Sequence, residues 1–275
     1  MRQARAAAAA LALLMPALAF SAVQAHQGSY SLRIDFLKPI DDSSWRVHVE
    51  LRGPGLDVGC TGVLRPNIYY IETRDISRSL VAAPLYYILD TVCPQAAARL
   101  ESISRASGGA PAVVTVNAPR GYLARSAMDW RGYGPPGGPY RVPLRMLARY
   151  YVFDSVVVAD ASSYHVVDNS STGLTIIYSS RLPGKTASYA AHVVAVVRSL
   201  VSQWLGPSPR SPVLVVLVDP EGQPLQLPKS GHSTGGMVYI KTGLLQVDLP
   251  WLVHTAAHET VHGWLNSGLL GGTSA

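Results

Sequence analysis

The stretch that decides the fold runs from Leu174 to Val218. It opens with the apolar segment Leu174-Thr175-Ile176-Ile177-Tyr178 and closes with the continuous apolar run Val213-Leu214-Val215-Val216-Leu217-Val218. Between them, Ala187 to Leu205 shows apolar residues at the three- and four-residue spacing of an amphipathic helix, namely Val193, Val194, Val197, Leu200, Val201 and Trp204. A strand, a helix and a buried strand in succession predict an α/β or α+β module.

The pattern continues downstream of Val218. A segment rich in Pro, Gly and Ser, from 219 to 236, reads as a loop, and Met237-Val238-Tyr239-Ile240 reads as a short strand. A last helix is expected to begin near Asp248, a good N-cap residue, and to run through His262. Pro250 is compatible with its first turn.

Residues 26–165 are β-rich instead. Segments 31–37 and 45–51 alternate apolar and polar side chains, as half-buried strands do, and 113–116 and 156–158 are short β-branched runs. Residues 96–104 read as a short helix, and 132–139 as a loop. We therefore predict an α+β protein, with an antiparallel β-rich domain over 26–165 and an incomplete catalytic module over 166–275.

The N-terminus is typical of a secretory signal peptide. Arg2 and Arg5 precede an apolar run from Ala6 to Phe20, and Val23-Gln24-Ala25 offers small residues where a signal peptidase cuts. A membrane anchor is the other reading, but a spanning helix needs about 20 apolar residues and this run is shorter. We expect cleavage after Ala25 and a secreted or periplasmic protein with no transmembrane segment in its mature chain.

Charge and cysteine content narrow the function classes. The formal net charge is +6, and Lys and Arg are scattered along the chain, so the sequence lacks the concentrated basic face of a nucleic-acid-binding protein. Cys60 and Cys93 are the two cysteines of the chain. In an oxidising compartment they most simply form one disulfide, and neither has a second Cys or His at zinc-finger spacing.

The candidate metal-binding and catalytic residues are in the segment His258-Glu259-Thr260-Val261-His262. Two histidines four positions apart lie one turn apart on the same helical face, so both imidazoles can bind one Zn²⁺ ion. Glu259 is rotated off that line, where it can act as a general base toward a metal-activated water. Apolar neighbours on both sides favour a packed helix that carries a metallopeptidase site.

The third zinc ligand is not evident. A metzincin would need Gly and His where Leu265 and Gly268 stand, so that class is excluded. Residues 263–275 contain no Asp, Glu or His. His254 extends the row by one turn but lies about 12 Å along the axis from His262, so it cannot share an ion with both other histidines. A supporting or packing role is expected for it.

Residues 258–266, with Trp264 two places after the second histidine, resemble the zinc helix of gluzincin metallopeptidases, specifically the aminopeptidase N-like and glycyl-aminopeptidase-like groups. Gly235-Gly236-Met237-Val238-Tyr239 resembles the Gly-x-Met-Glu-Asn substrate strand of that family, with Val238 in place of the Glu that holds a substrate's amino group. The resemblance covers about residues 150–275. It implies a thermolysin-like catalytic domain and a third ligand, a Glu, on a following helix past Ala275.

These observations predict an exported, zinc-dependent metallopeptidase that acts on a peptide or protein substrate. His258 and His262 would bind Zn²⁺, Glu259 would be the catalytic base, and Gly235, Gly236 and Met237 would pair with substrate backbone. A non-catalytic peptide- or protein-binding protein that keeps the scaffold is the alternative, although such a protein does not need Glu259. An interaction module built on the β-rich domain is a third reading.

Overall fold

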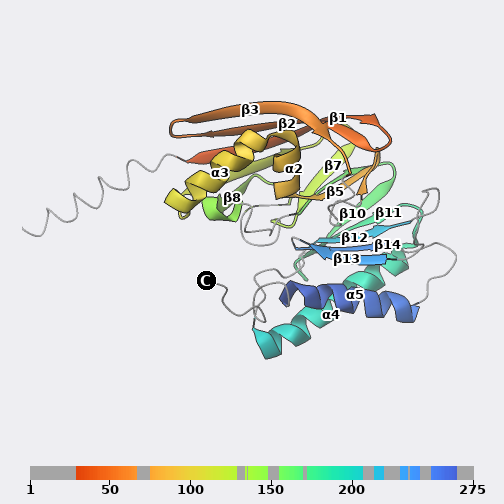
Figure 1. Ribbon diagram of the computed structural model, residues 1–275. Coiled ribbons are helices and arrows are strands. Elements are labelled where there is room, and N and C mark those ends of the chain that lie inside the picture. The colour runs from red at the N-terminus through yellow and green to blue at the C-terminus, as the bar shows by residue number, and fades with distance from the viewer. Residues whose placement is uncertain are drawn as a thin grey trace, which may run out of the picture.

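The computed structural model describes residues 29–66, 75–128, 134, 136–147, 155–169, 172–206, 214–219, 230–234, 236–241 and 249–264. It is an α+β fold in which three β-sheets are stacked and one outer face is covered by two helices (Figure 1). The expected signal peptide, residues 1–25, lies outside the described residues. No described helix has the length and apolar character needed to cross a membrane.

Sheet A, the outermost layer, has the strand order β3-β2-β1-β6-β8. Its strands are β1 (Tyr30–Asp41), β2 (Ser44–Gly53), β3 (Leu56–Leu64), β6 (Pro111–Asn117) and β8 (Tyr140–Pro143). The predicted strands at 31–37, 45–51 and 113–116 are therefore confirmed. The purely antiparallel arrangement is wrong, because β1 and β6 run parallel. The chain between β3 and β6 passes through other strands and two helices before it returns.

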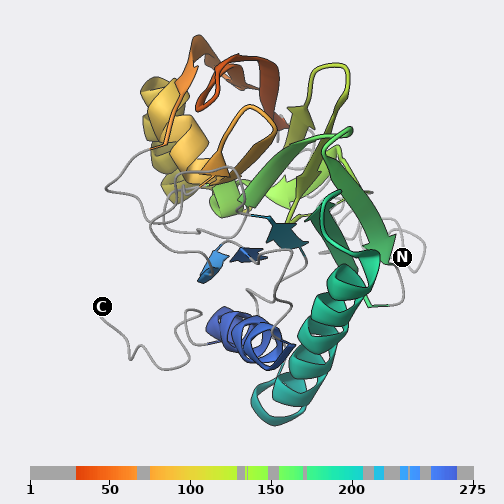
Figure 2. The ribbon, with the colours of Figure 1, turned by 90° about the vertical axis from the view of Figure 1, so that its right-hand side faces the viewer.

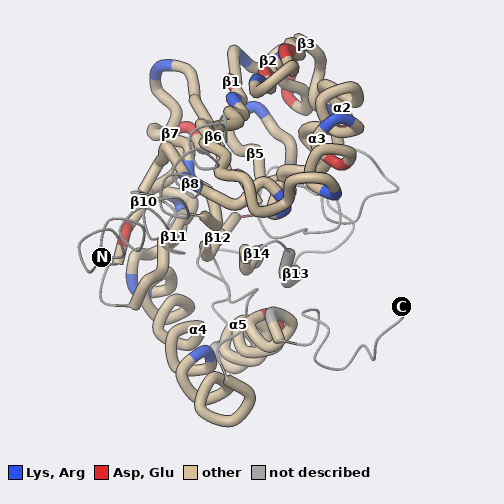
Figure 3. Tube along the Cα trace, turned by 90° about the vertical axis from the view of Figure 1, so that its left-hand side faces the viewer, with Lys and Arg blue, Asp and Glu red and all other residues tan. Residues whose placement is uncertain are grey.

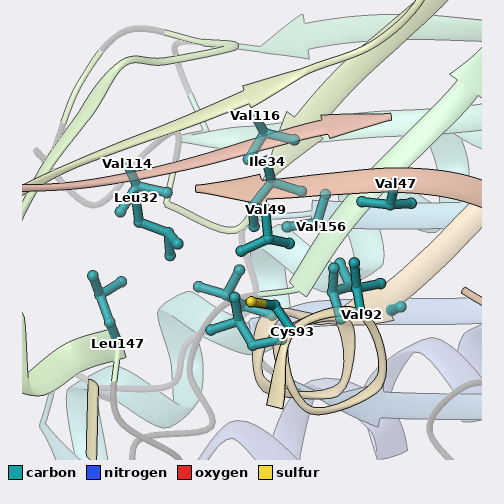
Figure 4. Packing of buried hydrophobic residues seen from close by; sticks show 14 of the residues in the cluster. Leu32, Ile34, Val47, Val49, Val92, Cys93, Val114, Val116, Leu147 and Val156 are labelled. Atoms are coloured by element: carbon teal, nitrogen blue, oxygen red, sulfur yellow. The ribbon is translucent and has the colours of Figure 1, made fainter. Parts of the chain in front are cut away.

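Those two helices pack on the inner face of sheet A. They are α2 (Leu85–Val92) and α3 (Pro94–Ser107), and the helix predicted over 96–104 lies within α3. Cys93, between them, is disulfide-bonded to Cys60 on β3, with the Cα atoms 5.4 Å apart. A side chain at Gly62 would approach the carbonyl oxygen of Val92 to 3.0 Å, so glycine allows β3 and α2 to pack this closely. Figure 4 shows Cys93 among the buried apolar residues of this core.

Removal of this disulfide should destabilise the protein measurably. The bond closes a loop with a sequence separation of 33 residues. Loop-closure entropy then predicts that the double variant Cys60→Ala/Cys93→Ala loses about 3–4 kcal/mol of unfolding free energy. Urea unfolding measures the loss, and the reduced wild-type protein serves as the control for lost sulfur packing. An unchanged midpoint would contradict a stabilising role.

Sheet B is the middle layer, with the strand order β4-β5-β9-β7. Its strands are β4 (Asp75–Ile76), β5 (Leu80–Pro84), β7 (Tyr122–Ser126) and β9 (Ser155–Asp160). Alternate residues of β5 and β9 enter different cores. Val81, Ala83, Val156 and Val158 face sheet A, and Leu80, Ala82, Val157 and Ala159 belong to the core shared with the next sheet. Because both faces are covered, these strands read as apolar runs without alternation.

Sheet C has the strand order β10-β11-β12-β14-β13. Its strands are β10 (Tyr164–Asn169), β11 (Leu174–Ser179), β12 (Leu214–Val218), β13 (Ser230–Thr234) and β14 (Met237–Lys241). β11, β12 and β14 are parallel neighbours, and β13 is antiparallel to β14. The strands predicted at 174–178, 213–218 and 237–240 are confirmed. β13 corrects the prediction that 219–236 is loop throughout.

Two helices cover the far face of sheet C, α4 (Gly184–Leu205) and α5 (Leu249–Trp264). Their buried residues Ala187, Val194, Leu252 and Ala256 form one core with inward side chains of β12 and β14. Figures 1 and 2 show the two helices side by side beneath the sheet. α4 follows β11 and leads to β12, as the stretch from 174 to 218 predicted.

The two halves of the chain pack against each other directly. The chain passes from sheet B to sheet C between Asp160 and Tyr164, near the boundary expected at 165. Sheets B and C share a buried apolar core. Beside it, Arg125 of β7 forms an ion pair with Asp168 of β10, with Nη2 2.9 Å from Oδ2, and Thr175 donates to the same carboxylate.

Candidate metal centre

Helix α5 has a buried face and a more exposed face, because successive residues turn by about 100° around its axis. Leu252, Ala256 and Thr260 lie on the face toward sheet C and are buried. His258 is exposed and His262 half-buried on the next face. Glu259 lies at the border between these faces and is only 7% exposed. The helix predicted by the sequence is thus confirmed, while the expected N-cap Asp248 lies outside the described residues.

The two histidines converge on one point. The Nε2 atoms of His258 and His262 are 3.1 Å apart. Two imidazole nitrogens bound to one tetrahedral zinc at about 2.0–2.1 Å would lie about 3.3 Å from each other. The separation of the two nitrogens is therefore close to that of two ligands of one zinc ion. The same distance also permits a hydrogen bond between the rings when one of them carries a proton on Nε2.

His254 takes a different orientation. Its ring stacks on that of His258, with centroids 6.1 Å apart and planes inclined by 22°. The rings of His258 and His262 are nearly perpendicular, at 78°, with centroids 4.8 Å apart. His254–His258 and His258–His262 have the same spacing in sequence but different ring geometry. The stacked arrangement of the first pair agrees with a packing role for His254.

Glu259 differs from the histidines in its surroundings. Burial raises the pKa of its carboxyl above the ordinary value, and the nearby His262 and His258 act in the opposite direction. A carboxylate that is poorly hydrated is a stronger proton acceptor than one in water. Its location, adjacent to the histidine pair and off the histidine row, is the one that the sequence predicted for a general base.

The C-terminal turn of α5 is fixed to α4. The indole Nε1 of Trp264 donates a 2.9 Å hydrogen bond to the carbonyl oxygen of Gly206, and Trp264 is 1% exposed. Gly206 follows α4 with a positive φ of 76°, a conformation that favours glycine. One turn earlier, Thr260 Oγ1 donates to the carbonyl oxygen of Ala256 at 2.6 Å. These contacts hold the turn that carries His262.

Within the described part of the chain, the metal centre has two candidate protein ligands. No group of three or more His, Cys, Asp or Glu side chains is placed there to hold one ion. The Nδ1 atom of His262 is also buried with no hydrogen-bond partner among those residues. Zinc-binding histidines usually donate this second nitrogen to an oxygen acceptor.

The strand β14, which contains Met237 of the segment predicted to bind substrate, is already paired with a strand on each side. Gly235 lies outside the described residues, and Gly236, with φ 77°, is in the turn between β13 and β14. Met237 pairs with Thr234 on one side and with Leu214 on the other. A substrate strand could pair with Met237 only if β13 were displaced. Val238 is fully buried in the core beneath the sheet, beside the residues of α5.

The free edge on this side of the sheet belongs to β13, which sequence reasoning missed. β13 is the last strand in the described order of sheet C, and α5 packs against it. A signal was present in the sequence. Gly235-Gly236 joins two short segments and is a typical two-residue hairpin connection. The low apolar content of Ser230–Thr234 concealed the first strand of that hairpin.

The chain matches no model of a known protein family, and no curated protein matches it.

Proposed function

We propose that this chain is an exported zinc metallopeptidase whose metal centre is built on α5. The observation that supports the proposal most directly is the 3.1 Å separation of the His258 and His262 Nε2 atoms, next to a buried glutamate. The position of α5 beneath a mixed sheet with an antiparallel edge strand is compatible with the start of a thermolysin-like catalytic domain. Export rests on the N-terminal sequence.

In the proposed mechanism His258 and His262 would hold a zinc ion through their Nε2 atoms. When bound, zinc supplies Lewis acidity, which polarises a scissile carbonyl and makes water more acidic. Glu259 accepts the proton of the attacking water on a carboxylate oxygen and then delivers it to the leaving amine. Its burial excludes competing water from that carboxylate. The ring of His254 stacks on that of His258 and is not a ligand in this mechanism.

The substrate is proposed to be an extended peptide that adds to the sheet at β13. The outer backbone groups of an edge strand are free to pair with another strand. β13 is in contact with α5, so a peptide paired with β13 would lie near the helix that carries the histidine pair. This assignment replaces Met237 and Gly236 as the pairing backbone and leaves them a structural role in the hairpin. The third ligand is proposed to lie beyond Ala275.

Zinc titration tests the ligand assignment without relying on activity. We expect the chain to bind zinc, and His258→Ala or His262→Ala to weaken binding by more than about 100-fold, beyond the 10–100-fold typical for loss of a supporting group. His254→Ala is the matched control, one turn away on the same row, and should weaken binding by less than about 10-fold. Calorimetry and elemental analysis of the dialysed protein give both numbers.

Two results would contradict the assignment. If the wild-type chain binds no zinc, the 3.1 Å contact is a hydrogen bond between two histidines. If His254→Ala weakens binding as much as His262→Ala does, the two zinc ligands are not His258 and His262 alone.

A further inference from the structure

The outer face of α4 is unusually apolar for an exposed surface. Trp204 is 81% exposed, Leu205 55%, Leu200 47%, and Tyr189 and Val196 41% each. These are five of the nine large apolar residues that are exposed in the described part of the chain, and all five belong to one helix. Exposed apolar side chains scattered singly need no explanation, whereas a contiguous group marks a contact surface.

The exposed residues form a continuous stripe along the helix. Tyr189, Val196, Leu200 and Trp204 follow each other at intervals of seven, four and four residues, and the half-buried Val193 and Val197 fill the interval. The opposite side of α4 packs on α5 and β11. Figure 2 shows α4 at the edge of the molecule, with no described element on its outer side. Within the described part of the chain, the side of α4 that bears the stripe is therefore left exposed.

The stripe is self-complementary. If two copies of α4 lie antiparallel and centred between Val196 and Val197, Tyr189 of one copy meets Trp204 of the other. In the same register Val193 meets Leu200, and Val196 meets Val197. Every member of the stripe then has an apolar partner, with aromatic pairs at both ends and aliphatic pairs at the centre. A two-fold axis requires such a reciprocal pattern, in which residue i meets j and j meets i.

Charge does not oppose this pairing. The lysines and arginines of α4 are Lys185 and Arg198, and the helix has no carboxylate. Arg198 lies on the side away from the stripe, where its Nη1 donates to the carbonyl oxygen of Thr172 at 3.3 Å. Lys185 is near the start of the helix, beyond the paired segment. In Figure 3 most of the Lys and Arg residues lie above α4 and α5, in the part of the molecule formed by sheets A and B and helices α2 and α3.

We propose that this stripe, Tyr189, Val193, Val196, Val197, Leu200 and Trp204, is the interface of a two-fold dimer of this chain. The stripe exposes on the order of 500 Å² of apolar surface per copy, near the upper end for an ordinary monomer. A stable dimer buries about 800 Å² per partner. The dimer is therefore expected to be weak and reversible. The proposal is independent of the metal centre.

Sedimentation equilibrium of the chain between about 1 and 200 µM tests the dimer. The wild type is expected to shift from monomer to dimer over this range, and Leu200→Asp to weaken association at least about tenfold because it places a carboxylate in the seam. Ser199→Asp is the matched control, because it adds the same charge to the exposed residue directly before Leu200, which is not part of the stripe. Monomer throughout the range, or equal effects of both variants, would overturn the proposal.

Introduced cysteines test the antiparallel register. Both native cysteines are in one disulfide, so an added cysteine is the only free thiol. A mixture of Tyr189→Cys and Trp204→Cys chains is expected to cross-link, while Tyr189→Cys alone is not, since its two copies would lie about 22 Å apart along the axis. Self-linking of Tyr189→Cys as fast as the mixed pair would overturn this register. Binding to lipid vesicles by a chain that remains monomeric would overturn the dimer itself.

Discussion

Glu259→Gln is expected to lower peptide hydrolysis by about 10²–10⁴-fold while zinc affinity changes little. Gln keeps the shape of the side chain but cannot accept the proton of the attacking water. Hydrolysis should be measured with quenched fluorescent peptides on the longest natural form of the polypeptide. Glu101→Gln on α3 is the control, because it makes the same chemical change on a different layer. Intact hydrolysis in the Glu259→Gln protein would show that another group is the base.

The same substitution should also raise the stability of the metal-free protein. Glu259 is 7% exposed, and burial raises the pKa of its carboxyl. A neutral amide avoids the cost of burying a charge, so we expect a gain of about 1 kcal/mol in unfolding free energy at neutral pH. Urea unfolding in the presence of a chelator measures it. Loss of activity together with a gain of stability would mark Glu259 as retained for function rather than for folding.

Val238→Glu is expected to cost at least about 4 kcal/mol, a large part of the roughly 5–15 kcal/mol by which an ordinary domain is stable. This variant restores the residue of the substrate strand that the sequence resembles. Val238 is fully buried and its side chain is in the core with Leu252 and Ala256. A carboxylate there has no water and only apolar neighbours from that core. Circular dichroism and urea unfolding measure the loss.

Val167→Glu is the matched control for that experiment. Val167 is 44% exposed on β10, at the other edge of the same sheet, so the same substitution should change stability by less than about 0.5 kcal/mol. A stable Val238→Glu protein with aminopeptidase activity would instead show that position 238 faces substrate. The structural assignment of β14 as an interior strand would then be wrong.

Periodicity predicted the elements around the candidate centre well. The helix over 187–205 is α4, whose bounds are Gly184–Leu205, and the run 213–218 is β12. These segments are long or strongly apolar, so local pattern and tertiary burial favour the same structure. His258, Glu259 and His262 were predicted from spacing alone, because a helix fixes which side chains share a face.

The missed elements lack such agreement between pattern and burial. Leu80–Pro84 is buried on both faces and therefore shows no alternation. Ser230–Thr234 has almost no apolar residues, and its strand conformation depends on pairing with β14. The pairing of Met237 on both sides could not be predicted either. Strand order is set by contacts between segments that are distant in sequence.

The shared middle layer restricts how this protein can be divided or recombined. β5 and β9 contribute alternate side chains to the cores on both of their faces. Sheet B is therefore part of the core with sheet A and also part of the core with sheet C. A fragment cut near residue 165 would leave Leu214, Val216, Met237 and Tyr239 without their covering strands. The half that carries α5 is therefore not a portable module. Any gene fusion or domain exchange that preserves it has to inherit the N-terminal sheets as well.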